Sequence, residues 1–333
     1  MCDQPPEGAR AHPSKTWWRT ALYLGLTAVV LYFVGRHLVG NLRDFGWNAV
    51  RMDPGFLTVA VLSMAAQHLL AAFNYSQILT AFGCSIGRVR VLAIYCTATL
   101  GKYVPGKVAT FAGSVMLLRR FQVPLPVALA TPFLASGVAI LTGLIASTPL
   151  LLMEGVREHF AAESVVAGAM MLAGLVSLHP RVFIPIANVV LRRFKREPMQ
   201  PVTSARQLLA AVAVSLGRYA LLGVSLWATA RSMTNAASED LLAFTATASS
   251  AAVLGVLAFF SPAGLGVREG VYVFVLGPMI GPEMASLVAI VARIVQTGVE
   301  LAAGAAGIIF VKWQAHRMAA ARGTPLRELE NDA

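Results

Sequence analysis

The stretch LLAFTATASSAAVLGVLAFFSPAGLGVREGVYVFVLGPMIG, residues 241–281, is apolar over most of its length but is broken near its middle by SPAGLG at 261–266. Proline and glycine interrupt helices, because proline lacks an N–H and glycine readily adopts non-helical backbone angles. Another apolar stretch, residues 91–118, lies earlier in the chain and is broken in a similar way by YVPGK at 103–107. Each arm of this earlier stretch reaches only about 20 Å as a helix, too short to cross a ~30 Å hydrocarbon core comfortably.

The chain as a whole has the composition of a membrane protein. Hydrophobic residues make up 57% of the 333 residues and charged residues 13%, compared with about 45–50% and about 25% in soluble domains. We therefore predict an all-α, polytopic transmembrane helix bundle. The six segments predicted to cross fully are 17–38, 55–81, 124–152, 163–179, 206–231 and 283–312.

Basic side chains cluster at the ends of the apolar runs, and such clusters lie preferentially on the cytoplasmic side of a membrane. This rule places both termini in the cytoplasm and makes each broken stretch a re-entrant hairpin that enters and leaves on one side. Two full crossings per stretch are the alternative. The clusters placed inside are the two tails, Arg88 with Arg90, Arg119 with Arg120, and 181–206, and the segments placed outside are 154–163 and 232–240.

The order of crossings and hairpins predicts an inverted-topology repeat. Residues 17–153 form the first repeat and 154–314 the second, between a disordered cytoplasmic tail at 1–16 and a cytoplasmic tail at 315–333. Each hairpin tip contains an aromatic residue, a proline and then glycine. Such repeats are common in transporters, because two states related by the pseudo-symmetry open to opposite sides. The alternative is that the breaks are ordinary kinks in spanning helices.

Charged side chains at bilayer depth cost about 2.5–3.5 kcal/mol each, so they need partners or a wet cavity. Cations in excess over buried acids suit an anionic ligand such as a lipid phosphate. Half-helices that start at the tips would add N–H groups and positive dipole ends. The predicted headgroup-binding residues are Lys102, Lys107, Arg218, Arg268 and Glu269, and the predicted hinge or tip residues are Pro105, Gly106, Pro262, Gly264 and Gly266.

Arg293, Gln296 and Glu300 fall at spacings that place them on one face of a helix. That face is expected to look inward and line the cavity. The alternative is that Arg293 and Glu300 form a structural ion pair or are part of a polar helix seam. On an earlier crossing, Gln67 and His68 are predicted to line the same cavity, although an interior histidine is often simply hydrogen-bonded.

Other functional classes lack a visible site. The sequence has no H-E-x-x-H, no G-x-S-x-G and no paired-cysteine motif, so we expect no enzymatic activity, no cofactor and no metal. The net charge of +11 comes from basic residues at the ends of apolar runs without interleaved aromatic residues. Anionic phospholipid, and not nucleic acid, is therefore the expected counter-charge.

The second break, with Pro262, Gly264, Gly266, Arg268 and Glu269 in SPAGLGVRE, resembles the P-x-G-L-G-x-R-E signature of the lysylphosphatidylglycerol synthase transmembrane-region family, also called flippase-like. The first break, PGK at 105–107, is similar to a second feature of that family, a P-G followed by a basic residue. Alanine stands at 263 where the family often has glycine, and Ala109-Thr110 stands where a glycine–acidic pair is common. The resemblance covers most of the chain.

This resemblance implies a polytopic membrane protein that moves or binds anionic or aminoacylated lipids. Because no aminoacyl transferase domain follows residue 312, synthase activity is not expected. The leading hypothesis is a lipid flippase or lipid-binding transporter with a mid-membrane basic cavity, in the cytoplasmic (inner) membrane of a bacterium. The runner-up is a non-transporting accessory protein that presents a lipid to a partner enzyme of lipid or cell-envelope biosynthesis, and an intramembrane enzyme is the third alternative.

Overall fold

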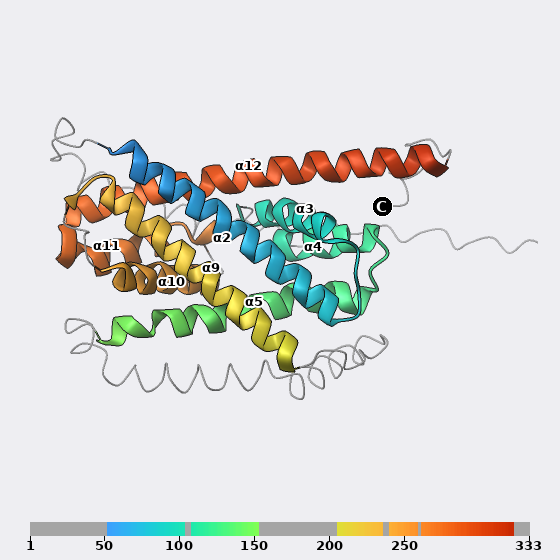
Figure 1. Ribbon diagram of the computed structural model, residues 1–333, viewed down its shortest axis with the longest axis horizontal. Coiled ribbons are helices and arrows are strands. Elements are labelled where there is room, and N and C mark those ends of the chain that lie inside the picture. Colours follow the sequence, from blue (N-terminus) through green and yellow to red (C-terminus); the bar gives the residue numbers. More distant parts are fainter. Residues whose placement is uncertain (1–51, 104–107, 153–204, 236–239, 259–260, 323–333) are drawn as a thin grey trace, which may run out of the picture.

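The computed structural model describes residues 52–103, 108–152, 205–235, 240–258 and 261–322. Every regular element in these ranges is a helix (Figure 1). In chain order the elements are α2 (Pro54–Ala81), α3 (Arg88–Thr99), η2 (Leu100–Tyr103), α4 (Val108–Arg120), α5 (Leu125–Ser147), η3 (Thr148–Leu152), α9 (Ala205–Arg231), α10 (Leu241–Leu257), η5 (Pro262–Gly264), α11 (Val267–Ile280) and α12 (Pro282–Arg322).

Four helices, α2, α5, α9 and α12, are long and apolar enough to cross a membrane. They fall on four of the six predicted crossings, and the chain is an integral membrane protein. The other two predicted crossings, 17–38 and 163–179, lie outside the described residues. Helix α12 continues past the predicted end of its crossing at 312 to Arg322 and extends beyond the other helices (Figure 1).

Helices α2 and α9 pack side by side and run antiparallel (Figure 1). Their ends are joined by a backbone hydrogen bond of 2.8 Å from the Asp53 N–H to the Ser232 carbonyl. The Asp53 carboxylate also caps the start of α2, where it accepts from the Gly55 N–H at 2.7 Å. Further along, the Ser225 hydroxyl donates to the Ala60 carbonyl at 2.8 Å. This pair is a framework beside which the broken stretches lie.

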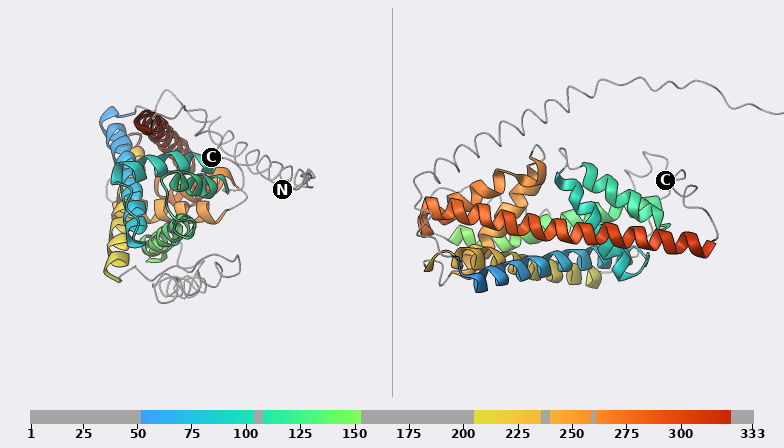
Figure 2. Two further views of the ribbon diagram at one scale, coloured as in Figure 1. Left: turned by 90° about the vertical axis from the view of Figure 1, so that its right-hand side faces the viewer. Right: turned by 90° about the horizontal axis from the view of Figure 1, so that it is seen from above.

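Both broken stretches form helical hairpins. The first consists of α3, η2 and α4, the second of α10, η5 and α11, and the arms within each are in contact. The arms hold 12, 13, 17 and 14 residues, so each reaches about 18–26 Å and is shorter than a ~30 Å hydrocarbon core. The hairpins lie at opposite ends of the bundle and their tips meet near its middle, where η2 contacts η5 (Figures 1 and 2).

Helix α12 approaches α3 and the following η2 closely at two glycines. A Cβ on Gly307 would lie 2.8 Å from the Ala93 carbonyl oxygen, and a Cβ on Gly304 would lie 2.6 Å from the Leu100 side chain. Small residues allow helix backbones to come this near in membranes. The close approach brings Glu300, one turn before Gly304, beside the tip of the first hairpin.

The largest cluster of buried apolar side chains lies where α9, α10, α11 and α12 meet. Phe244 on α10 and Leu276 on α11 are fully buried in it, together with Val288 on α12. Each buried side chain makes many van der Waals contacts, and together these contacts hold the four helices against one another. The cluster fixes the second hairpin against α9 and α12.

Candidate functional site

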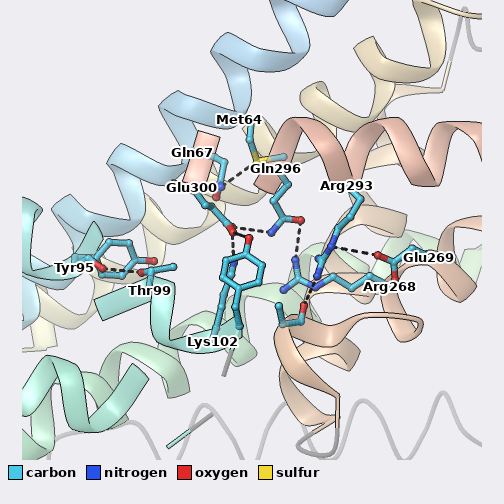
Figure 3. Close-up of polar contacts among 12 residues, drawn as sticks. Met64, Gln67, Tyr95, Thr99, Lys102, Arg268, Glu269, Arg293, Gln296 and Glu300 are labelled. Atoms are coloured by element: carbon cyan, nitrogen blue, oxygen red, sulfur yellow. Dashed lines mark hydrogen bonds and ion pairs between the residues drawn. The ribbon is translucent and has the colours of Figure 1, made fainter. Parts of the chain in front are cut away.

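Glu300 on α12 is buried, and both of its carboxylate oxygens accept hydrogen bonds (Figure 3). Lys102 Nζ in η2 donates to Oε1 at 2.5 Å and forms an ion pair with it. Gln296 Nε2, one turn earlier on α12, donates to the same oxygen at 2.9 Å. The Tyr103 hydroxyl donates to Oε2 at 2.6 Å. Glu300 therefore fastens the tip of the first hairpin to α12.

Arg293 fastens the second hairpin to the same helix. Its Nη2 donates to the Ala263 carbonyl at 3.0 Å, and its Nε lies 3.4 Å from Glu269 Oε1 (Figure 3). The other carboxylate oxygen of Glu269 accepts from the Gly266 N–H at 2.7 Å. Glu269 thus closes the first turn of α11 and neutralises Arg293 at once.

Gln296 connects the two attachments. Its Oε1 accepts from Arg268 Nη1 at 3.2 Å, while its Nε2 donates to Glu300. A side-chain amide can do both because it carries an acceptor and two donors. The network therefore runs from Arg268 at the second hairpin through Gln296 and Glu300 to Lys102 at the first (Figure 3). The face of α12 that carries these residues points toward the two tips (Figure 3).

The second tip depends on backbone conformations that favour glycine. Gly264 and Gly266 have φ of +72° and +85°, and Ala263 has φ of +53° despite its side chain. Space also requires glycine at 264, because a Cβ there would lie 2.8 Å from the Gly255 Cα. On Gly255 itself, a Cβ would lie 2.6 Å from Arg268 Nε. The absent side chains allow α10, the tip and Arg268 to pack together.

Cations outnumber carboxylates in this network. Lys102 pairs with Glu300, and Arg293 with Glu269. Arg268 has no carboxylate within ion-pair distance among the described residues, and its buried Nε has no hydrogen-bond partner there. An unneutralised cation at bilayer depth is costly, so the cluster is one that an anion would stabilise.

A second set of polar side chains lies on α2, to one side of the network. His68 is buried, its ring lies 5.5 Å from that of Tyr95, and its Nε2 has no hydrogen-bond partner within the described ranges. Gln67 is also buried, and within the described ranges its amide donates to a weak acceptor, Met64 Sδ, at 3.4 Å. His68 Nε2 is therefore available to a polar guest or to water.

Arg218 on α9 belongs to this second group. Its guanidinium lies 4.5 Å from the centre of the Tyr219 ring. Arg218 interacts electrostatically with His68, as do Lys102 and Glu300. In the part of the chain that the structure describes, no hydrogen bond or ion pair joins Arg218 to the network on α12.

The structure pairs the predicted residues differently from the sequence-based expectation. Arg293 and Glu300 do not pair with each other, because they lie about 10 Å apart along α12 and each reaches the nearer hairpin. Lys102 is not an unpaired cation, since Glu300 neutralises it. The N–H of Gly266 is not free for a ligand, because Glu269 accepts it.

Some predicted residues cannot be placed in this network. Lys107, Pro105 and Gly106 lie outside the described residues, and Pro262 begins η5. Conversely, the sequence indicated Tyr103 only as an aromatic tip residue, although its hydroxyl donates to Glu300. The feature of the sequence that could have pointed to Tyr103 was its position next to Lys102 at the break. Nothing in the sequence identifies the Ala263 carbonyl as the acceptor of Arg293.

The residues that build the second tip are those of the signature P-x-G-L-G-x-R-E, and the family model for the lysylphosphatidylglycerol synthase TM region matches residues 16–304. The chain belongs to this family. The match includes both hairpins, three of the four long helices in full, and Arg293 to Glu300 of α12. Among curated proteins, none matches the chain. Membership of the lysylphosphatidylglycerol synthase TM-region family indicates a membrane function related to lipids.

Proposed function

We propose that this protein binds an anionic or aminoacylated lipid and moves it across the membrane, with the headgroup accommodated where the two hairpin tips meet α12. The observation that carries the proposal is the positive excess of the network, in which Arg268 has no carboxylate partner and a buried Nε without an acceptor in the described ranges. A lipid phosphate supplies the negative charge that this network lacks. Arg218 adds a second cation to one side, near His68. In this proposal His68 and Gln67 line the path of the headgroup.

An inverted-topology repeat provides the transport mechanism. In it, α2, the first hairpin and α5 correspond to α9, the second hairpin and α12. The contacts support this correspondence, because α12 packs on α3 as α5 packs on α10, and α2 contacts α3 as α9 contacts α10. The corresponding long helices run in opposite directions (Figure 1). If the two repeats exchanged conformations, the tips would open to the opposite side of the membrane.

The proposed setting is the inner membrane of a bacterium. Arg88, Arg90, Arg119 and Arg120 lie at one end of the bundle and face the cytoplasm in this proposal, as basic clusters generally do. The partner is the lipid itself, made by a lipid-biosynthetic enzyme. The protein's own role is transport without catalysis.

The test is lipid translocation by the purified protein in proteoliposomes. Vesicles of phosphatidylcholine would carry a small fraction of fluorescent phosphatidylglycerol, and a membrane-impermeant quencher would report the fraction exposed outside. We expect faster loss of sidedness than in protein-free vesicles, and slower loss with the Arg268→Ala variant. Binding of phosphatidylglycerol without any translocation would replace the transporter by an accessory protein that only presents the lipid.

A further inference from the structure

The surroundings of the Glu300 carboxylate have the composition of an anion-binding site. An ammonium group, a phenol hydroxyl and an amide NH2 converge on its two oxygens, from Lys102, Tyr103 and Gln296, at 2.5, 2.6 and 2.9 Å. Two of these donors belong to the first hairpin and one to α12. Gln296 also accepts a hydrogen bond from Arg268, so this position adjoins the Arg268 end of the network.

A phosphodiester carries the same single negative charge as a carboxylate and also presents two unesterified oxygens. Charge-assisted donors such as these bind either group. We propose that Lys102, Tyr103 and Gln296 form a binding position for the phosphodiester of the lipid headgroup, and that Glu300 occupies this position when no lipid is bound. This inference rests on the proposed function and identifies the step by which the headgroup is admitted.

The displaced carboxylate has a cation that can receive it. Gln296 alone lies between Glu300 and Arg268 in the network, and the buried Arg268 Nε has no acceptor among the described residues. Exchange would leave Lys102 paired with the phosphodiester and Glu300 paired with Arg268. Charge pairing at bilayer depth is then conserved, which keeps the cost of the exchange low.

The exchange would also release the first hairpin from α12. Both side-chain bonds from η2 to Glu300, those of Lys102 and Tyr103, are given up when the carboxylate leaves. Lipid binding is thereby coupled to freedom of that tip. As an internal competitor, Glu300 lowers the apparent affinity for the lipid by the fraction of time that it fills the position.

The experiment compares Glu300→Gln with the wild type in binding to phosphatidylcholine vesicles that contain phosphatidylglycerol. Glutamine keeps the shape but removes the competing charge, so we expect binding about tenfold tighter and translocation slower. Glu283→Gln is the matched control, because Glu283 lies on the same helix, is exposed and undergoes the same change in charge. We expect it to bind and translocate as the wild type does.

Tyr103→Phe tests the position itself, since it removes one donor and keeps the ring. In the Glu300→Gln background we expect Tyr103→Phe to weaken the binding of phosphatidylglycerol several-fold, which removes part of the gain in affinity. Inorganic phosphate, titrated alone and as a competitor, distinguishes a lipid headgroup from a free anion. Weak competition at high concentration is expected, whereas phosphate binding as tight as that of phosphatidylglycerol would overturn the lipid assignment.

Unchanged affinity in a folded Glu300→Gln protein, or no effect of Tyr103→Phe in that background, would overturn the exchange while leaving the proposed function in place. If wild type and variants all bind phosphatidylglycerol no better than phosphatidylcholine, the proposed function itself fails. Thermal unfolding in detergent verifies folding. Should Glu300→Gln not fold, Glu300→Asp, which retracts the charge by one methylene, is expected to bind more tightly than wild type, and equal binding would contradict the proposal.

Discussion

Arg293 and Glu269 join α12 to the start of α11 through an ion pair of 3.4 Å between Nε and Oε1, with side chains only 13% and 7% exposed. Glu269 is engaged on its other oxygen too, by the Gly266 N–H. The Glu269 carboxylate therefore holds the second hairpin in place. Its partner is Arg293 on another helix, not its neighbour Arg268.

Replacement of Glu269 by alanine should destabilise the protein. It strands the buried Arg293 and removes the acceptor of Gly266, and breaking one partner of a buried pair typically costs about 3–5 kcal/mol. Thermal unfolding in detergent measures the effect, with Glu283→Ala as the exposed control on α12. A variant as stable as wild type that has lost only lipid binding would instead place Glu269 in contact with the headgroup.

Arg268→Ala should have the opposite profile. Because no carboxylate is stranded, the loss of stability is limited to the hydrogen bond to Gln296, about 1–2 kcal/mol, while binding of phosphatidylglycerol should weaken about tenfold. Arg231→Ala, at the far end of α9, is the control for loss of one positive charge. A large drop in unfolding temperature with unchanged binding per folded molecule would contradict a role of Arg268 in lipid binding.

Gly307→Ala tests the approach of α12 to α3. The new methyl group would lie 2.8 Å from the Ala93 carbonyl oxygen, and backbone cannot move aside cheaply, so we expect about 1–3 kcal/mol of destabilisation. Gly298→Ala is the matched control, since a Cβ there meets nothing within 4 Å. Equal unfolding temperatures for the two variants would mean that the helices are not packed as described.

The orientation can be tested by cysteine labelling in a background without Cys2, Cys84 and Cys96. A cysteine at Arg120, at the end of α4, should be protected from an impermeant thiol reagent added to intact cells. One at Glu283, at the start of α12, should react. Labelling of both from the same side would reject the proposed arrangement of the bundle.

The breaks and the long helices could be predicted because their causes are local. Hydropathy marks the crossings, and proline with glycine marks the tip at which Gly264 and Gly266 adopt positive φ. The partners of Arg293 and Glu300 could not be predicted, because they depend on which hairpin lies beside each turn of α12. That arrangement follows from packing between segments about 200 residues apart in sequence, such as Tyr103 and Glu300, whose separation is 197.

The continuity of α12 between its two attachments gives it the mechanics of a lever. Arg293 and Glu300 are about 10 Å apart along a rigid helix, so a tilt of about 10° that pivots on Arg293 displaces Glu300 by about 2 Å. That displacement exceeds the tolerance of a hydrogen bond. A small rigid-body motion of one helix is therefore enough to release one hairpin while holding the other.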